Sequence, residues 1–593
     1  MARNKFDVDE KLEVEFNIKH FKRLFGYLKP YRLQVYLVMF LMIAASVASM
    51  LGPYLTKVAI DEKIPNGDIR GLLVLAGIFL GTLIINSLCL KYKIRTMSDV
   101  GQKVIYKIRE DLFVHLQKLP FSYYDSRPHG KILVRVVNYV NSLDNLLSNG
   151  LINVVTDLFS LIVIVGFMLA INIKLTFICL IGLPILIFAI FLIKNLQRKA
   201  WQVLSSKRSN MNAYIHESIA GMKVTQSFVR EDENLKIFRE VNDAYRSAWF
   251  KAVRNNFLLW PTVQVISVLV VSAVYIVGIT WIGNGITVGV LVAFMGYIGR
   301  FWAPISNLGN FYNTIIETMA YLERIFETMD EEVLVRDTKE AATMPNIKGN
   351  VEFRNVCFEY EKDNPILKDV NLIAKEGETI AIVGPTGAGK TTIINLISRF
   401  YNLTSGKVLI DGIDISTVTL NSLRSQMGIM LQDTFIFSGT IIDNIRYSKL
   451  DATDEEVMAA AKAVKAHDFI IEMEKGYNTE VNERGTRLSV GQRQLISFAR
   501  ALLADPRILI LDEATSSIDT ETEKALQEGL NRLLRGRTSF VIAHRLSTIK
   551  NASKIIYIDS GRIIEEGSHD ELIKERGAYW KLYTSQNSFL QAM

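Results

Sequence analysis

Long stretches without charged residues dominate the first half of the chain. Residues 33–56 and 71–90 contain no Asp, Glu, Lys or Arg, residues 147–193 contain two, and residues 255–299 contain none. A helix needs about 20 apolar residues to cross a membrane, so each shorter stretch predicts one span and each longer one a helical hairpin. We therefore expect six spans, over residues 33–56, 71–90, 150–171, 175–193, 257–281 and 286–308.

Turn-forming residues divide both long stretches, at Asn172-Ile173-Lys174 and at Gly283-Asn284-Gly285. The alternative interpretation is a set of buried helices in a soluble protein. It is disfavoured because an uncharged stretch as long as residues 255–299 would not stay dissolved in water. The six-span prediction therefore stands.

Basic residues are concentrated in every second segment between the spans. Eight Lys and Arg residues precede the first span, ten lie in residues 91–135 and twelve in residues 194–254, whereas the opposite connections are poor in both. Cytoplasmic segments carry the excess of Lys and Arg. Both termini are therefore expected in the cytoplasm, with the spans in the cytoplasmic membrane. The long basic segments have helical spacing and few prolines, so we expect the spans to continue into the cytoplasm as helices.

The amino-acid composition further restricts the class of protein to which the chain can belong. The 593 residues are 49% hydrophobic and 22% charged, with a net charge of +7. Because the basic residues follow the topology, the positive charge does not indicate a nucleic-acid partner, and membrane lipids are the expected surroundings. Three cysteines cannot build a disulfide scaffold, and the seven histidines lack the spacing of a metal site.

A different pattern begins after residue 330. Residues 331–347 are mixed and unpatterned, as in a linker, and from about residue 350 short β-branched runs alternate with helical patterns. This alternation is typical of an α/β domain. We therefore expect an all-α membrane domain over residues 1–330 with cytoplasmic helical extensions, followed by an α/β domain over residues 348–593.

A phosphate-binding loop opens the α/β domain. Residues 384–391 match G-x-x-x-x-G-K-[ST], directly after the strand-like residues 379–383 and before the helix-like residues 392–400. Glycines let backbone N–H groups approach a phosphate, and the start of a helix adds a positive end. Lys390 is expected to reach the β- and γ-phosphates of a nucleotide, and Thr391 to bind Mg²⁺.

Two carboxylates follow an apolar run downstream. Residues 508–511 predict a buried parallel strand that ends in Asp512 and Glu513. At this distance from a phosphate-binding loop, Asp512 is expected to hold Mg²⁺ through water. Glu513 is expected to orient or deprotonate the water that attacks the γ-phosphate.

The motif Leu488-Ser489-Val490-Gly491-Gln492, together with the phosphate-binding loop, resembles the signature of ATP-binding cassette (ABC) transporters. The resemblance covers nearly the whole chain and is closest to a half-transporter of the exporter type, in particular the multidrug class. It implies a head-to-tail dimer in which ATP lies between the loop of one subunit and the signature motif of the other. It also implies ATP hydrolysis coupled to transport, with ATP and Mg²⁺ as cofactors.

Further residues match the family at the expected places. Tyr360 would stack on adenine, Gln432 would sense Mg²⁺ and the γ-phosphate, His544 would contact the γ-phosphate, and residues 483–485 resemble an exporter loop that touches the helical extensions. The implied set is catalytic residues Glu513, His544 and Gln432; ATP-binding residues Tyr360, Gly384, Pro385, Thr386, Gly387, Ala388, Gly389, Lys390, Thr391, Thr392, Gln432 and Asp512; Mg²⁺-binding residues Thr391, Gln432 and Asp512; and Ser489, Val490, Gly491, Gln492 and Asp519 toward the ATP of the partner.

One residue departs from the family pattern. The commonest signature is L-S-G-G-Q, and Val490 replaces its first glycine. Heterodimeric exporters commonly contain one degenerate site, so this substitution slightly favours a heterodimer over a homodimer.

The membrane half carries few clues to the cargo. One interpretation is that a substrate cavity is lined by Arg300 and Trp302 of the sixth span together with Asp157 of the third span. The alternative is that the two charged residues are paired with each other or hydrated. Turns near Tyr124 and Gly221 resemble the family's coupling helices. Export of hydrophobic or amphipathic compounds is the favoured function, with lipid flipping as the alternative and an ATP-gated channel or regulator as a third hypothesis.

Overall fold

The computed structural model describes residues 18–127, 129–283, 286–430, 434–482, 485–512, 520–542 and 549–591. The chain divides into two compact units. One comprises Met1–Gln117 and His129–Glu331, and the other Lys118–Pro128 and Glu332–Met593.

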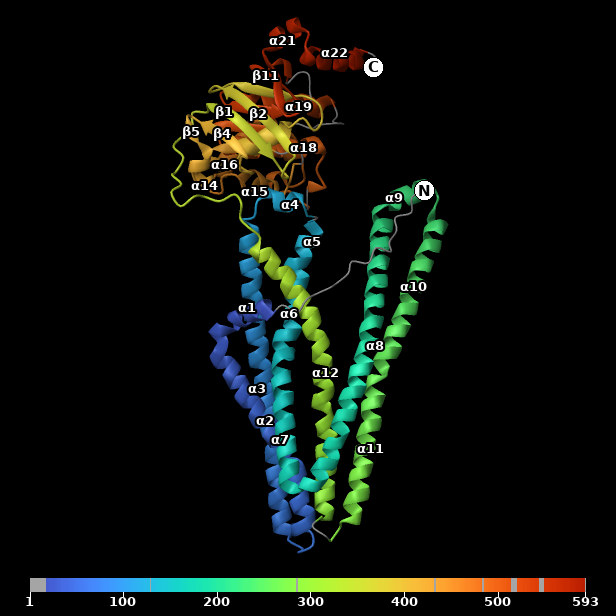
Figure 1. The fold of residues 1–593 in the computed structure, drawn as a ribbon. Helices are drawn as coiled ribbons and strands as arrows, with labels where there is room; N and C mark the ends of the chain where they lie inside the picture. Colours follow the sequence, from blue (N-terminus) through green and yellow to red (C-terminus); the bar gives the residue numbers. More distant parts are fainter. Residues whose placement is uncertain are drawn as a thin grey trace. The chain divides into compact units, whose positions relative to one another are not determined.

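Long helices build the first unit (Figure 1). The described residues contain six helices that are long and apolar enough to cross a membrane, within Lys19–Lys63, Ile69–Leu116, Asn153–Ile171, Ile173–Ala220, Glu231–Thr280 and Val288–Ile305. The helices of this unit are α1 (Ile18–Leu28), α2 (Arg32–Val58), α3 (Ile69–Leu116), α5 (His129–Val134), α6 (Val140–Asp144), α7 (Leu151–Ile171), α8 (Ile173–Ala220), α9 (Met222–Ser227), α10 (Glu231–Phe257), α11 (Leu259–Thr280) and α12 (Val288–Asp330).

Three helices among the described residues of this unit, α3, α8 and the 43-residue α12, are far longer than a bilayer requires. Both α3 and α8 contain 48 residues. At about 1.5 Å per residue each extends for about 72 Å, against about 30 Å for the hydrocarbon core of a membrane. The prediction of helices that continue beyond the spans is therefore confirmed. Helix α8 begins at the predicted turn, where the Asn172 side chain accepts a hydrogen bond from the Leu175 N–H at 3.1 Å.

The helices of the first unit differ in what covers them. Helix α2 packs on α3, α7 and α12, while α8 runs beside α10 and α11 (Figure 1). In the most apolar 18-residue stretch of α3, only 6% of the residues are buried. In the Val288–Ile305 segment of α12, 61% of the residues are buried. The exposed side chains of α3 in its first half are large and apolar, such as Leu73, Ile78 and Leu83. This face of α3 suits contact with lipid.

The second unit is an α/β domain that also includes α4 (Phe121–Asp125). Its sheets have the strand orders β2-β1-β4-β5, β12-β11-β3-β10-β9-β6 and β7-β8. The strands are β1 (Val351–Glu359), β2 (Pro365–Ala374), β3 (Thr379–Val383), β4 (Ser405–Ile410), β5 (Ile413–Asp414), β6 (Met427–Met430), β7 (Gly439–Thr440), β8 (Glu480–Val481), β9 (Ile508–Asp512), β10 (Thr538–Ile542), β11 (Lys554–Asp559) and β12 (Arg562–Gly567). The other helices of the unit are α13 (Lys390–Ile397), α14 (Leu420–Arg424), α15 (Ile441–Arg446), α16 (Asp454–Ala463), α17 (His467–Ile471), α18 (Val490–Leu503), α19 (Thr520–Leu534), α21 (His569–Glu575) and α22 (Ala578–Gln591).

Five parallel neighbours form most of the larger sheet. Strands β11, β3, β10, β9 and β6 all run in the same direction. Successive side chains of β3 enter different cores: Ile380 and Ile382 belong to one hydrophobic cluster, Ala381 and Val383 to the other. A strand buried on both faces needs apolar residues throughout, which explains the uninterrupted apolar runs in the sequence. The predicted combination of a membrane-spanning helical domain with an α/β domain is confirmed.

Candidate functional site

The phosphate-binding loop connects β3 to α13. Its three glycines have left-handed backbone angles, with φ of 149° at Gly384, 81° at Gly387 and 105° at Gly389. A Cβ atom on Gly384 would lie 2.0 Å from the Ile558 carbonyl oxygen, and one on Gly389 would lie 2.7 Å from Leu367 Cδ2. Other residues would therefore strain or displace the loop. The loop ends where α13 begins, which directs the first N–H groups of that helix toward the loop.

Lys390 bends back over the loop. Its ammonium group donates hydrogen bonds to the carbonyl oxygens of Gly384 and Pro385, both at 2.8 Å. Desolvation lowers the pKa of Lys390, and the negative charge of Asp512 opposes that shift. The amine is therefore held at the loop, within the electrostatic influence of a carboxylate from β9.

Asp512 reaches the same edge of the sheet because of the strand order. It pairs with Ile542 of β10, which in turn pairs with Ile382 of β3. Two strand spacings of about 4.8 Å place β9 about 10 Å from the strand that leads into the loop. A hydroxyl from Thr391 and a carboxylate from Asp512 are oxygen donors of the kind that Mg²⁺ prefers, so these residues fit the ion.

Tyr360 lies against the helix that follows the loop. Its hydroxyl and that of Thr392 are 3.2 Å apart, and Thr392 is only 4% exposed. The ring meets Phe358 and Tyr401 edge to face, with centroids 4.7 and 5.0 Å away. The Tyr360 side chain remains 46% exposed. An exposed aromatic ring anchored beside the phosphate-binding helix can stack on a nucleobase.

The signature motif caps α18. The Ser489 hydroxyl accepts a hydrogen bond from the Gln492 N–H at 3.2 Å, and the Gln492 side chain accepts one from the Ser489 N–H at 2.9 Å. This reciprocal capping box satisfies the start of the helix and orients Ser489. Gly491 is buried, whereas Val490 is 45% exposed. Val490, which replaces the glycine common in the family, therefore exposes its two methyl groups on the surface at the start of α18.

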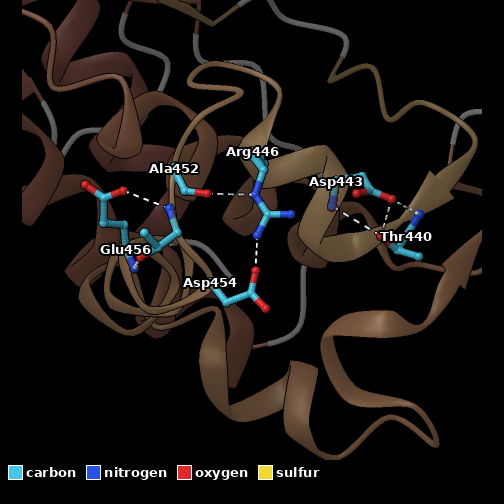
Figure 2. A network of polar contacts seen from close by, with 7 residues as sticks. Thr440, Asp443, Arg446, Ala452, Asp454 and Glu456 are labelled. Carbon is cyan, nitrogen blue, oxygen red and sulfur yellow. Dashed lines mark hydrogen bonds and ion pairs between the residues drawn. The ribbon is translucent and has the colours of Figure 1, made fainter.

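Capped helices also support the segment before α18 (Figure 2). Thr440 and Asp443 form a capping box on α15. Arg446 at the end of α15 donates a hydrogen bond to the Ala452 carbonyl at 3.0 Å and pairs with Asp454 at the start of α16 (Figure 2). Arg500 of α18 donates to the Asn444 carbonyl at 2.8 Å. These contacts attach α15 to α18, and with it to the signature motif.

Several residues of the expected site lie outside the described residues, namely Gln432, Glu483, Arg484, Glu513, Asp519 and His544. Three of them follow described strands in the sequence: Gln432 comes after β6, Glu513 after β9 and His544 after β10. Their roles stay predictions.

A contact between α4 and the rest of the second unit was not predicted from the sequence. The Tyr401 hydroxyl donates to the Asp125 carboxylate at 2.5 Å, and the rings of Phe121 and Phe400 lie 4.3 Å apart. Burial raises the pKa of Tyr401, and the hydrogen bond to Asp125 raises it further, so the phenol stays protonated. The expected coupling turn near Tyr124 belongs to this helix. The feature of the sequence that could have indicated this contact is the aromatic pair at residues 400–401, which follows the phosphate-binding helix.

The three cavity candidates of the first unit have different surroundings. Trp302 is 4% exposed and packs near Gly182 of α8, within the hydrophobic core of the unit. Asp157 accepts a hydrogen bond from the Asn307 side chain and lies close to Lys93. Arg300 is exposed and donates to the Ser49 carbonyl of α2. The described contacts of Asp157 thus lead to α12 and α3 and not to Arg300.

Comparison with known proteins matches both units. Residues 35–305 match the family model described as "ABC transporter transmembrane region" and residues 367–516 match "ABC transporter". The chain is 44% identical to the "Uncharacterized ABC transporter ATP-binding protein YknV" of Bacillus subtilis (strain 168), over 99% of this chain and 98% of the relative. It is 39% identical to the "Putative multidrug export ATP-binding/permease protein YgaD" of the same strain, over 95% and 99%.

A solved structure, "Structure of a bacterial Atm1-family ABC exporter with ATP bound", superimposes with a TM-score of 0.79 at 30% identity, covering 94% of this chain and 98% of that chain. Relatives of similar identity are named for different cargoes. They include a "Fatty acid ABC transporter ATP-binding/permease protein" of Mycobacterium bovis (38% identity; 82% and 77% covered) and an "ATP-dependent lipid A-core flippase" of Desulfotalea psychrophila (36%; 95% and 99%). The α/β unit is an ATPase that hydrolyses ATP. The chain belongs to the ABC transporters, as an exporter half-transporter with a multi-pass membrane region and an ATPase domain fused in one polypeptide.

Proposed function

We propose that this half-transporter exports hydrophobic or amphipathic compounds, including drugs, across the cytoplasmic membrane. The main structural support for ATP-driven transport is the contact of α4 with the ATPase domain. Through Tyr401 and Asp125, and through Phe121 and Phe400, a turn between two membrane-spanning segments is attached to the domain that hydrolyses ATP. Such an attachment lets closure of the ATPase domains alter the membrane helices. The YgaD relative, named for multidrug export, supports the choice of cargo.

Hydrolysis would use the residues gathered at one edge of the larger sheet. Lys390 would hold the β- and γ-phosphates, Tyr360 would stack on adenine, and Glu513 would orient the attacking water. Thr391 and Asp512, with Gln432, would hold Mg²⁺, which neutralises phosphate charge when bound. Rate enhancement would come mainly from positioning and from charge stabilisation.

A second subunit would complete each site. Half-transporters of this family dimerise, and Ser489 with Gly491 would then meet the γ-phosphate held by the partner. The partner is proposed to be a different half-transporter, because Val490 alters the signature that this chain offers. Purification of the single chain as a stable homodimer with full ATPase activity would contradict a heterodimer.

Lipid flipping is the second candidate, supported by the flippase relative. The two candidates are distinguished by reconstituting the full-length protein with its co-purified partner in proteoliposomes. ATP-dependent accumulation of dyes supports drug export, and ATP-dependent movement of fluorescent lipids between leaflets supports flipping. Glu513→Gln is the matched control and should nearly abolish both. Nucleotide-dependent currents without concentrative transport would favour the third hypothesis, an ATP-gated channel.

A further inference from the structure

A proline in α2 leaves a carbonyl group without its helical partner, and α12 supplies a replacement. Pro53 lies inside α2 and has no N–H to donate to the carbonyl of Ser49, four residues earlier. The guanidinium of Arg300 donates Nη1–H to this oxygen. The neighbouring Met50 carbonyl accepts the Tyr297 hydroxyl at 2.8 Å. The Arg300 side chain is therefore anchored at a defined position rather than free to snorkel toward the membrane surface.

Arg300 belongs to an exposed stripe of α12 that does not suit lipid. Around it Tyr297, Ile298, Phe301 and Trp302 are buried, whereas Arg300 is exposed. The exposed stripe runs along one side of the helix, at the spacing that 3.6 residues per turn requires; its members are Val292, Met295, Gly299, Arg300, Ala303 and Asn307. A glycine, an arginine, an alanine and an asparagine contrast with the large apolar side chains exposed on α3. The stripe therefore suits a water-accessible pathway, the usual location of a charge within the membrane.

The depth of Arg300 makes its charge consequential. It lies twelve residues after the first residue of α12, Val288. At about 1.5 Å per residue this is about 18 Å along the helix, close to the middle of a hydrocarbon core of about 30 Å. Among the described residues, Arg300 contacts the Ser49 carbonyl and lies near the Tyr297 phenol, and no carboxylate forms an ion pair with it. Most of its five N–H groups thus remain available to a ligand.

We propose that Arg300 is the counter-charge for the anionic headgroup, a carboxylate or a phosphate, of an amphipathic cargo bound along the α12 stripe. The bond to Ser49 orients the guanidinium in advance, and the planar fork of the remaining N–H groups matches the oxygens of either anion. The proposal rests on the proposed export function and names the charge class of its cargo.

The test uses probes that share one apolar chain and differ in charge. Oleate, oleyl phosphate, oleyl alcohol and oleylamine are added below their micellar concentrations to proteoliposomes of the full transporter. The readout is the half-maximal concentration for stimulation of ATP hydrolysis, expressed as the ratio of each charged probe to oleyl alcohol. The wild-type protein should respond to oleate, oleyl phosphate or both at lower concentrations than to the alcohol. Which of the two anions is favoured identifies the headgroup.

Arg300→Gln removes the charge and keeps an N–H donor for Ser49. It should raise the half-maximal concentration of the favoured anion by about tenfold to a hundredfold, as expected for a hydrogen bond to a charged group, and should leave the ratio for oleylamine unaffected or lower. Arg300→Lys should retain most of the preference for the anion.

Pro53→Ala distinguishes ligand binding by Arg300 from its hydrogen bond to the Ser49 carbonyl. An alanine at this position would supply the N–H that this carbonyl lacks. If Arg300 serves only the helix, Arg300→Gln in the Pro53→Ala background should respond to anions like the wild-type protein, which would overturn the proposal. A persistent loss of anion preference in that background supports it. Equal responses of the wild-type protein to all four probes would also overturn it while leaving export intact. Absence of ATP-dependent transport of any compound would instead refute the proposed function.

Discussion

The hydrogen bond from Tyr401 to Asp125 gives a direct test of how α4 is attached to the ATPase domain. Tyr401→Phe removes one hydroxyl and keeps the ring that packs against Phe358 and Tyr360. A hydrogen bond to a charged acceptor contributes about 1.5–3 kcal/mol. Because the Asp125 carboxylate is exposed, we discount this to about 1 kcal/mol. The attached state of α4 should therefore become about fivefold less favoured.

Hydrogen exchange of the amides in residues 121–125 reports on this attachment, and the number of molecules transported per ATP reports on its consequence. Tyr401→Phe should speed the exchange about fivefold and lower the transport ratio. Asp125→Ala should have the same effect, and the double variant should be no worse than either single one, because the two side chains share a single interaction. Additive effects, or unchanged exchange in Tyr401→Phe, would refute the reasoning.

Three further outcomes follow from the described geometry. Gly384→Ala should abolish ATP binding, measured by calorimetry, because its Cβ would lie 2.0 Å from the Ile558 carbonyl oxygen. Lys390→Met should lower kcat by about a hundredfold or more, because it removes the charge that stabilises the transferred phosphoryl group. Thermal stability should change little, since Lys390 is only partly buried and its partners are loop carbonyls. Val490→Gly should raise ATPase activity if the altered signature weakens the partner's site; unchanged activity would exclude Val490 as the cause of asymmetry.

The sequence predicted most of the architecture because its two halves obey different physical constraints. Apolar stretches such as residues 255–299 leave little choice except a membrane, and the apolar run ending at Asp512 is what a buried parallel strand requires. The loop glycines also predict their own conformation, since few residues tolerate the angles observed at Gly384.

Contacts between distant segments could not be predicted in the same way. Nothing local in the sequence pairs Tyr401 with Asp125, which are 276 positions apart, or aims Arg300 at the carbonyl of Ser49, 251 positions away. Both depend on how whole helices pack. Trp302 illustrates the same limit, because its position beside Arg300 in the sequence conceals that the two side chains lie on different faces of α12, one buried and one exposed.

The length of α8 has a mechanical consequence. A straight rod of 48 residues is about 72 Å long, so tilting it by about 5° about one end moves the other end by about 6 Å, slightly more than one helical turn. The same tilt shifts a residue one turn from the pivot by only about 0.5 Å, an amount that close-packed side chains can absorb. The helix thus acts as a lever. Spin labels near Ala220 should report displacements, measured as distances, that labels near Ile173 barely register.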